Sequence, residues 1–503
     1  HMPLQTSEDF GARDFASDGK LQIHDHLFPS ANTGVTWLMD CPEGTAAHER
    51  LLQECMRVDL FGLKEDGAIT GELHAPLRPV LPTLQPGKTY LLETVIRTLK
   101  MGHIFTQGTS DSNEVWLEVT VKSGDRVIGR SGHIDESGEV DRWSHFLNSF
   151  VLDENGNRIN RRNAQDIRVP LYNHQMPPGA GQVVHYELPV PDDVDQPVTI
   201  EVKLQYRKFD QEFMAIIAQR HKPGDLPLRG HEPGKPYRNP LPIITMATDS
   251  ITLPIAGGDA EPLTQQDRSI PLWQRWNDYG IGLFLEGKAE LKQAEEAFQQ
   301  VEELGRYDGP LNLARVYQRE GRLDEAVRAL QRAGDHADPP APPWTLSWLT
   351  GVVNAQQGNL KTAEENFRAV LDMKVPERKF DFSRDYEVIN ELGLTLFRLA
   401  QQQRGEARKA ARDELLTEAV EVFRKTLSLD SENVTAHYNL QLLYQQLGQT
   451  ELADEHAKLH QRFKEDDTIR GEVIRKARAQ YPAADHAAEA LVIHSLTRDL
   501  ESK

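Results

Sequence analysis

The segment LARVYQREGRLDEAVRALQRA, residues 313–333, carries the pattern that decides the fold of the C-terminal half. Gly321 is followed five, nine and twelve residues later by Ala326, Leu330 and Ala333. The same intervals recur in two further sets, namely Gly358, Ala363, Phe367 and Val370, and Gly448, Ala453, Ala457 and His460. A fixed set of intervals anchored on glycine indicates one structural unit that is repeated along the chain.

Each unit has the spacing of two helices joined by a tight turn. Residues seven and four positions before the three glycines form the pairs Ala314 and Tyr317, Gly351 and Asn354, and Gln441 and Tyr444. Small residues let two helices approach closely, and a glycine ends the first helix because it accepts a left-handed backbone. The unit therefore resembles the tetratricopeptide repeat, a helix–turn–helix of about 34 residues.

Two less regular units, at 276–298 and 392–423, bring the array to about five repeats over 272–465. The second of them contains a charged insert, 401–414, which we interpret as a helix extension. We therefore expect an α-solenoid over residues 266–467 whose groove binds a protein partner, followed by a C-terminal helical cap over 468–503.

The N-terminal half has the period of β-strands. Apolar and polar residues alternate in 114–121 and 198–206, which is typical of half-buried antiparallel strands. Further strands are expected near 89–97, 126–131, 148–152, 183–188 and 242–254. Together they predict an antiparallel β-sandwich of about seven strands, Ig-like, over residues 81–265. Residues 1–80, with a short helix at 44–57, are expected to pack on this domain or on a missing module.

Composition limits the possible functions. The chain has 503 residues, with 57 Lys and Arg against 77 Asp and Glu, which gives a formal net charge of −20. Such an acidic chain is a poor candidate for general binding to nucleic acids or anionic membranes. The two cysteines, Cys41 and Cys55, exclude a disulfide-dense scaffold; two buried thiols are favoured over a bridge between them.

No complete catalytic constellation is evident, since the sequence lacks a P-loop and the GxSxG, HExxH and CxxC motifs. An enzyme in its own right is thus the least favoured class. The N-terminal half contains several histidines, among them the pair in His24-Asp25-His26, and the one in Met101-Gly102-His103-Ile104-Phe105. From the residues alone, loop or core histidines are favoured over metal ligands.

The segment 101–109 resembles the GHxFPTG segment of multihaem c-type cytochromes with tetratricopeptide tails, although Thr106 stands where proline is frequent. Residues 26–33 (HLFPSANT) are similar to the HxFxxANTA segment of that family, and 110–119, 131–135, 176–179 and 481–489 also look familial. The resemblance implies that His103 and His26 are distal haem iron ligands, with Phe105, Phe28 and Trp37 available to wall a haem pocket.

The resemblance also implies where haem is attached and where the protein acts. The chain has no CxxCH motif, so haem c would be attached to an upstream module and none to this chain. In the family such a module ends in CxxCHMPL, and this sequence begins HMPL. The implied function is electron transfer in the periplasm or outside the cell, with the sandwich supporting the haem module. The alternative is a scaffold without a redox role that binds protein partners through its repeats.

Overall fold

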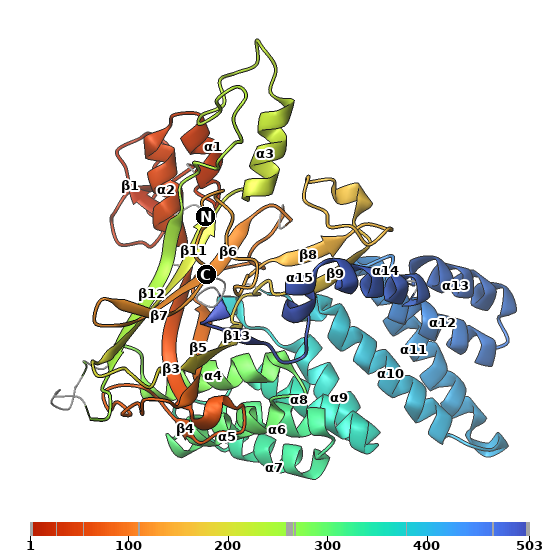
Figure 1. Cartoon of the computed structure of the whole chain (residues 1–503). Coiled ribbons are helices and arrows are strands. Elements are labelled where there is room, and N and C mark those ends of the chain that lie inside the picture. The colour runs from red at the N-terminus through yellow and green to blue at the C-terminus, as the bar shows by residue number, and fades with distance from the viewer. Residues whose placement is uncertain are drawn as a thin grey trace. The chain divides into compact units, whose positions relative to one another are not determined.

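The computed structural model describes residues 4–26, 28–53, 55–108, 111–257, 265, 268–378, 380–464 and 467–498. The chain divides into two compact units, one formed by His1–Glu290 with Thr468–Lys503 and the other by Leu291–Asp467 (Figure 1). The division near 290 lies beyond the boundary expected at 265. It also returns the residues after 468 to the first unit.

The first unit contains a five-stranded and a four-stranded sheet. The order of the larger sheet is β13-β10-β5-β3-β4, and that of the smaller is β12-β11-β6-β7. Their strands are β3 (Met56–Lys64), β4 (Leu73–His74), β5 (Thr89–Thr98), β6 (Glu114–Ser123), β7 (Arg126–Ser131), β10 (Gly181–Pro189), β11 (Val198–Arg207), β12 (Ile244–Leu253) and β13 (Ile493–Ser495). Two further pairs are β1 (Leu4–Thr6) with β2 (Gln22–His24), and β8 (Ser149–Leu152) with β9 (Val169–Asn173).

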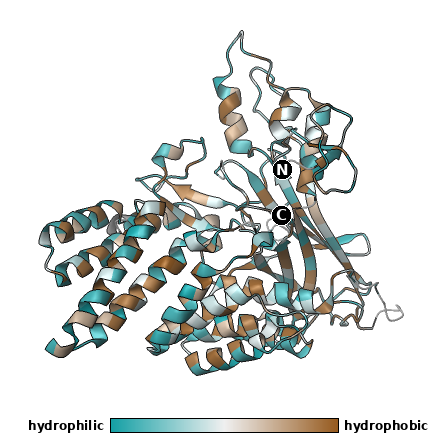
Figure 2. Ribbon diagram, turned by 180° about the vertical axis from the view of Figure 1, so that it is seen from behind, coloured by the Kyte–Doolittle hydropathy of each residue, from teal (hydrophilic) through white to brown (hydrophobic). Residues whose placement is uncertain are grey.

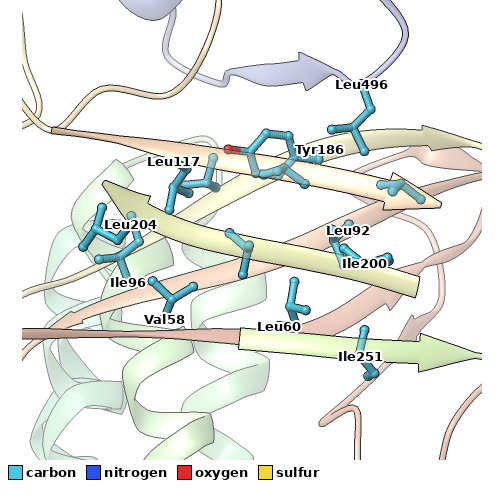
Figure 3. Close-up of a cluster of buried hydrophobic side chains, with 14 of the residues drawn as sticks. Val58, Leu60, Leu92, Ile96, Leu117, Tyr186, Ile200, Leu204, Ile251 and Leu496 are labelled. Atoms are coloured by element: carbon cyan, nitrogen blue, oxygen red, sulfur yellow. The ribbon is translucent and has the colours of Figure 1, made fainter. Parts of the chain in front are cut away.

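One hydrophobic core joins the two large sheets. Alternate residues of β5 and β10, such as Leu92, Ile96 and Tyr186, are buried with Leu117 of β6 and Leu204 of β11 (Figure 3). Because successive strand residues point to opposite faces, the residues between them lie on the other face of the larger sheet. All seven strands expected from the sequence are present, and Gly124, with φ 56°, lies in the turn between β6 and β7.

Three expectations for the N-terminal half need correction. The helix expected at 44–57 is α2 (Pro42–Leu52), and Met56 already begins β3, because the apolar run from 58 to 63 pairs with β5. The larger sheet is not wholly antiparallel, since β13 pairs in parallel with β10. A segment that returns after a long connection can join a sheet edge in either direction. Cys41 is exposed and only Cys55 is buried, and the two do not form a disulfide with each other.

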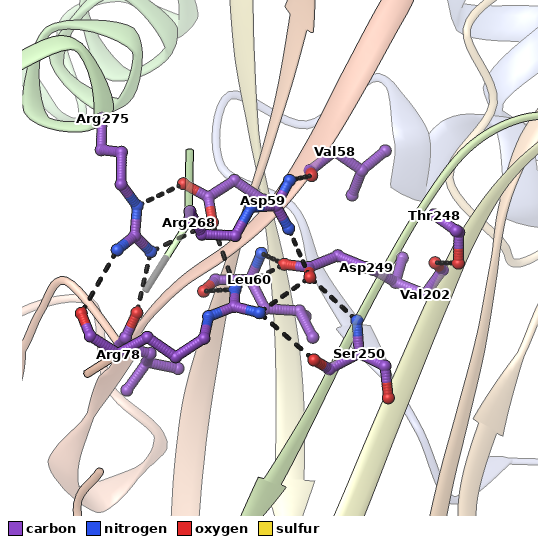
Figure 4. Close-up of polar contacts among 11 residues, drawn as sticks. Val58, Asp59, Leu60, Arg78, Val202, Thr248, Asp249, Ser250, Arg268 and Arg275 are labelled. Carbon is purple, nitrogen blue, oxygen red and sulfur yellow. Dashed lines mark hydrogen bonds and ion pairs between the residues drawn. The ribbon is translucent and has the colours of Figure 1, made fainter. Parts of the chain in front are cut away.

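The helix α4 (Leu272–Glu286) packs on β10 and β5. A Cβ atom on Gly282 would lie 2.6 Å from Cγ2 of Val183, so only glycine permits this approach. The interface is largely polar: Arg275 binds Asp59, while Arg57 and Arg97 both bind Asp278. Figure 4 shows that Arg275, Asp59, Arg78, Asp249 and Arg268 form one buried ion-pair network.

The C-terminal residues, which were expected to form a helical cap over 468–503, pack within the first unit. Val473 and Ala477 of α14 (Asp467–Gln480) share a hydrophobic cluster with Phe150 and Leu152 of β8. The following α15 (Pro482–Ala487) adds Ala484 to this cluster. The apolar stripe of α14 is therefore buried against the β8–β9 pair. Elsewhere in this unit, Trp37 and Leu38 of α1 (Thr33–Leu38) pack with Met214 of α3 (Gln211–Arg220).

The second unit is a tetratricopeptide-type array of helical hairpins. Its helices are α5 (Leu291–Glu303), α6 (Asp308–Glu320), α7 (Leu323–Gly334), α8 (Pro343–Gln357), α9 (Leu360–Asp372), α10 (Tyr386–Gln402), α11 (Lys409–Leu429), α12 (Val434–Gln446) and α13 (Thr450–Phe463). Polar and apolar residues alternate around these helices (Figure 2). The predicted helix-ending glycines are confirmed, since Gly321, Gly358 and Gly448 have φ values of 78°, 86° and 73°. The insert 401–414 extends α11 only from Lys409, because the chain leaves the helix after Gln402.

Candidate functional site

His103 lies in the loop between β5 and β6 and is exposed. Its Nδ1 atom is 2.9 Å from the carbonyl oxygen of Ile104. Phe105 is buried in the core of the two sheets, with its ring centroid 6.1 Å from that of Tyr206. The loop thus presents the imidazole at the surface while Phe105 anchors it, and Phe105 does not wall an open pocket.

His26 is also exposed, and its ring stacks on Phe28 with the centroids 5.9 Å apart. Phe28 is itself 55% exposed. Trp37 lies under the guanidinium of Arg229, 4.2 Å from its ring centroid, and packs in the cluster of α3. His26 and His103 therefore stand in different surroundings.

A buried polar cluster, which the sequence analysis did not predict, lies beneath α4. His185 of β10 stands directly opposite Glu93 of β5 in the sheet register. Glu286 is the last residue of α4, and Glu290 follows four residues later, beyond the turn at Gly287. His185, Glu93 and Glu290 are at most 1% exposed.

The imidazole of His185 contacts carboxylates through both nitrogens. Its Nδ1 lies 3.0 Å from Oε2 of Glu93, and its Nε2 lies 3.2 Å from Oε1 of Glu290 and 3.5 Å from Oε2 of Glu286. The other oxygen of Glu93 is 3.0 Å from Nζ of Lys64, which is also buried. One ligand atom each of His185, Glu286 and Glu290 lie within 4.8 Å of one another.

The electrostatics of this cluster are set by burial and by the crowding of carboxylates. Burial alone would lower the pKa of His185, but Glu93, Glu286 and Glu290 raise it well above its ordinary value. Burial raises the pKa of Glu286 to about 8, whereas the hydrogen bond with His185 lowers that of Glu290 against the effect of burial. Without a bound cation, these groups must therefore share protons to remain neutral.

A cavity of about 360 Å³ adjoins the cluster. Glu286 lines it together with Gln182 and three histidines, His145, His174 and His494. Burial lowers the pKa of all three imidazoles, that of His494 to about 3, so they are neutral near pH 7. The Nε2 atoms of His145 and His494 are buried without a hydrogen-bond partner. An unprotonated imidazole nitrogen can ligate a metal ion or accept a proton.

A larger cavity, of about 750 Å³, is lined in part by buried charged residues that form ion pairs. Arg207 binds Glu114 through Nε at 2.6 Å, and Arg158 lies 3.3 Å from both Asp210 and Glu212. Burial raises the pKa of Glu114 to about 7 and that of Asp210 to about 6. Because these buried charged groups are paired with one another, they are not free to bind a ligand in this cavity.

The sequence contained a faint signal for the buried cluster. Glu93 interrupts an otherwise apolar strand, and His185 occupies the same kind of position in 183–188. The alternation predicts that both side chains leave the core face, but it does not predict that β5 and β10 are neighbours or that α4 covers them. The partners of His185 therefore could not be predicted from the sequence.

Comparisons with known proteins do not assign the chain to a family. No family model matches it, and no curated protein is significantly similar. Solved structures that match include MamA from AMB-1, with 22% identity over 38% of this chain and 98% of that chain, at a TM-score of 0.29. Another is YrrB, described as a TPR protein with an unusual peptide-binding site, with 17% identity over 39% and 88% of the two chains, at a TM-score of 0.30. TM-scores this low do not establish a common fold. The tetratricopeptide assignment therefore rests on the repeat intervals and on the helical hairpins.

In the part of the chain that the structure describes, no helix is both long enough and apolar enough to cross a membrane.

Proposed function

We propose that the second unit is a scaffold that binds a protein partner through the first helices of its hairpins, α6, α8, α10 and α12. The observation that carries the proposal is that these helices contact one another in succession, α6 with α8, α8 with α10, and α10 with α12. Their outward side chains therefore form one continuous surface, as is usual where repeat arrays bind extended partners.

Two aromatic residues mark this surface at equivalent positions. Trp348 and Tyr438 each stand ten residues before a repeat glycine, Gly358 and Gly448 respectively, so they lie on the same side of their helices. Tyr438 is 47% exposed, and Trp348 is half-buried against Phe367. Partly exposed Trp and Tyr side chains supply much of the binding energy at interfaces, which favours a partner segment with apolar side chains.

The test is a comparison of matched variants of the full chain. Partners captured from the source organism are identified, purified and titrated against the wild type, the double variant Trp348→Ala/Tyr438→Ala, and Leu452→Ala. Leu452 is a 40% exposed residue on the second helix α13 and serves as the control. We expect at least about tenfold weaker binding for the double variant. Equal affinities of the double variant and the wild type would refute a docking role for this face.

A second proposal is that the first unit supports a haem module. The exposed imidazoles of His103 and His26 favour it, because a distal ligand must reach iron held outside its own domain. In this proposal the two sheets are an Ig-like sandwich, haem c belongs to an upstream module or redox partner, and the protein transfers electrons in the periplasm or outside the cell.

The haem proposal is tested by expressing the chain with the upstream coding region of its native gene. CxxCH motifs in that region, bis-histidine spectra, and a change of one haem to high spin in His103→Ala are the expected results. The half-exposed His221 provides the control variant His221→Ala. An unchanged spectrum of His103→Ala and of His26→Ala would remove both residues as ligands.

A further inference from the structure

We propose that His185, Glu286 and Glu290 bind one divalent first-row metal ion in the first unit, with its remaining coordination position facing the histidine-lined cavity. One imidazole nitrogen and two carboxylate oxygens form a ligand set suited to Zn²⁺ and to similar ions such as Mn²⁺ and Co²⁺. The three side chains come from β10, the end of α4 and the turn after it.

The spacing of the ligand atoms matches that of a metal site. Two ligands at about 2.1 Å from a tetrahedral ion lie about 3.4 Å apart. The distances from Nε2 of His185 to the nearest oxygens of Glu290 and Glu286 are 3.2 and 3.5 Å. An ion placed among these atoms therefore needs only small movements of the side chains.

The surroundings supply the outer contacts that metal sites require. Nδ1 of His185 lies 3.0 Å from Oε2 of Glu93, on the side of the ring away from Glu286 and Glu290, which leaves Nε2 as the ligand nitrogen. Lys64 forms a 3.0 Å ion pair with Glu93. The positive charge of Lys64 is therefore compensated and does not repel an incoming cation. The backbone N–H of Val183 donates to Oε1 of Glu286 at 3.2 Å, which leaves Oε2 of Glu286 on the side of His185.

Charge balance also favours a cation. Once an ion has displaced the shared protons, the neutral imidazole of His185 and the two carboxylates of Glu286 and Glu290 carry two negative charges, which a divalent ion cancels in a buried site. Glu286 is about 20% exposed at its side chain and lines the cavity, so an ion has a path to the site. In the same cavity, His145 and His494 hold buried Nε2 atoms without partners, which is consistent with a polar guest there.

The experiment uses the full chain, free of any affinity tag, after removal of metals with a chelator. Zn²⁺ is titrated by calorimetry, and Co²⁺ is added separately to record its d–d absorption, which reports ligand number in the wild-type protein. We expect one ion per chain and a raised Tm. The isosteric variants Glu286→Gln and Glu290→Gln should each weaken binding at least tenfold, because the loss of a residue that only orients a ligand already weakens metal sites by about 10–100-fold.

His74→Ala is the matched control, since Nε2 of His74 lies 3.0 Å from Glu65 in a half-exposed pair of the same residue types. It should bind Zn²⁺ as the wild type does. The proposal is overturned if the wild type takes up no ion, or if folded Glu286→Gln and Glu290→Gln bind Zn²⁺ as tightly as the wild type. Should Glu290→Gln fail to fold, Glu286→Gln and the Co²⁺ spectrum of the wild type still decide the question.

Discussion

The guanidinium of Arg275 binds both carboxylate oxygens of Asp59, with Nε–Oδ2 and Nη2–Oδ1 distances of 2.8 and 3.1 Å. Arg275 belongs to α4 and Asp59 to β3, and each is buried. The pair therefore fixes the helix that carries Glu286 against the sheet that carries His185. Planar, two-point pairing of this kind gives geometric specificity as well as energy.

We expect Asp59→Asn to lower the free energy of unfolding by about 3–5 kcal/mol, because it leaves the charge of Arg275 buried without its partner. Urea unfolding followed by circular dichroism measures the change. The double variant Asp59→Asn/Arg275→Met should lose less than Asp59→Asn alone. A loss for Asp59→Asn below about 1 kcal/mol would show that the pair is not buried as described.

The exposed ion pairs of the repeats should behave differently. Arg322 contacts Glu295 at 2.7 Å and Glu325 at 2.6 Å, but its side chain is 34% exposed. Solvent and salt screen such pairs, so Arg322→Ala should cost less than about 1 kcal/mol, with a smaller cost at high salt. The same unfolding measurement checks this. If Arg322→Ala lowered the free energy of unfolding as much as Asp59→Asn does, the ion pairs of Arg322 would not be screened by solvent as we expect.

Gly351 is expected to be essential to the packing of one hairpin. A Cβ atom at this position of α8 would lie 2.5 Å from Cε1 of Phe367 in α9. Gly351→Ala should therefore destabilise the protein by about 1–3 kcal/mol through overpacking. Gly334→Ala is the control, because the nearest atom to its Cβ is 3.9 Å away, on Leu346. Thermal unfolding of the two variants should show a lower Tm for Gly351→Ala only.

Stability should fall in acid because of His494. Burial lowers the pKa of this residue from 6.5 to about 3, and the neighbouring His145, His174, His185 and His486 are the groups that face it. Between these pH values the unfolded chain binds a proton that the folded chain excludes. The free energy of unfolding should therefore decrease as pH falls below 6.5, by at most about 1.4 kcal/mol per pH unit for this one group.

His494→Asn tests this prediction, because an amide can replace Nδ1 as the donor to the carbonyl of Trp143, which now lies 2.9 Å away. We expect a shallower dependence of the unfolding free energy on pH between about 7 and 5. The dependence should not vanish, since burial also lowers the pKa of His145 and His174. An unchanged slope would show that His494 is protonated in the folded state.

The parts of the fold that were predictable are those set by neighbours in sequence. Gly321, Gly358 and Gly448 end helices because their local backbone is left-handed, and the intervals around them define each hairpin. The prediction of a helix at 44–57 was wrong at its C-terminal end, because pairing with β5 determines the conformation from Met56 onward. The assignment of His103 and His26 as haem ligands stays a prediction, because it depends on a haem module that would lie outside this chain.

The sequence by itself determined the repeat array and the seven expected strands, since period and glycine spacing act within about one helical turn or one strand. Only the tertiary structure decided that Glu93, His185, Glu286 and Glu290 meet, and that the C-terminal segment returns to β10. These residues are separated by up to about two hundred positions along the chain. Their meeting depends on which strands are neighbours and on the close approach of α4 at Gly282, and neither leaves a local pattern in the sequence.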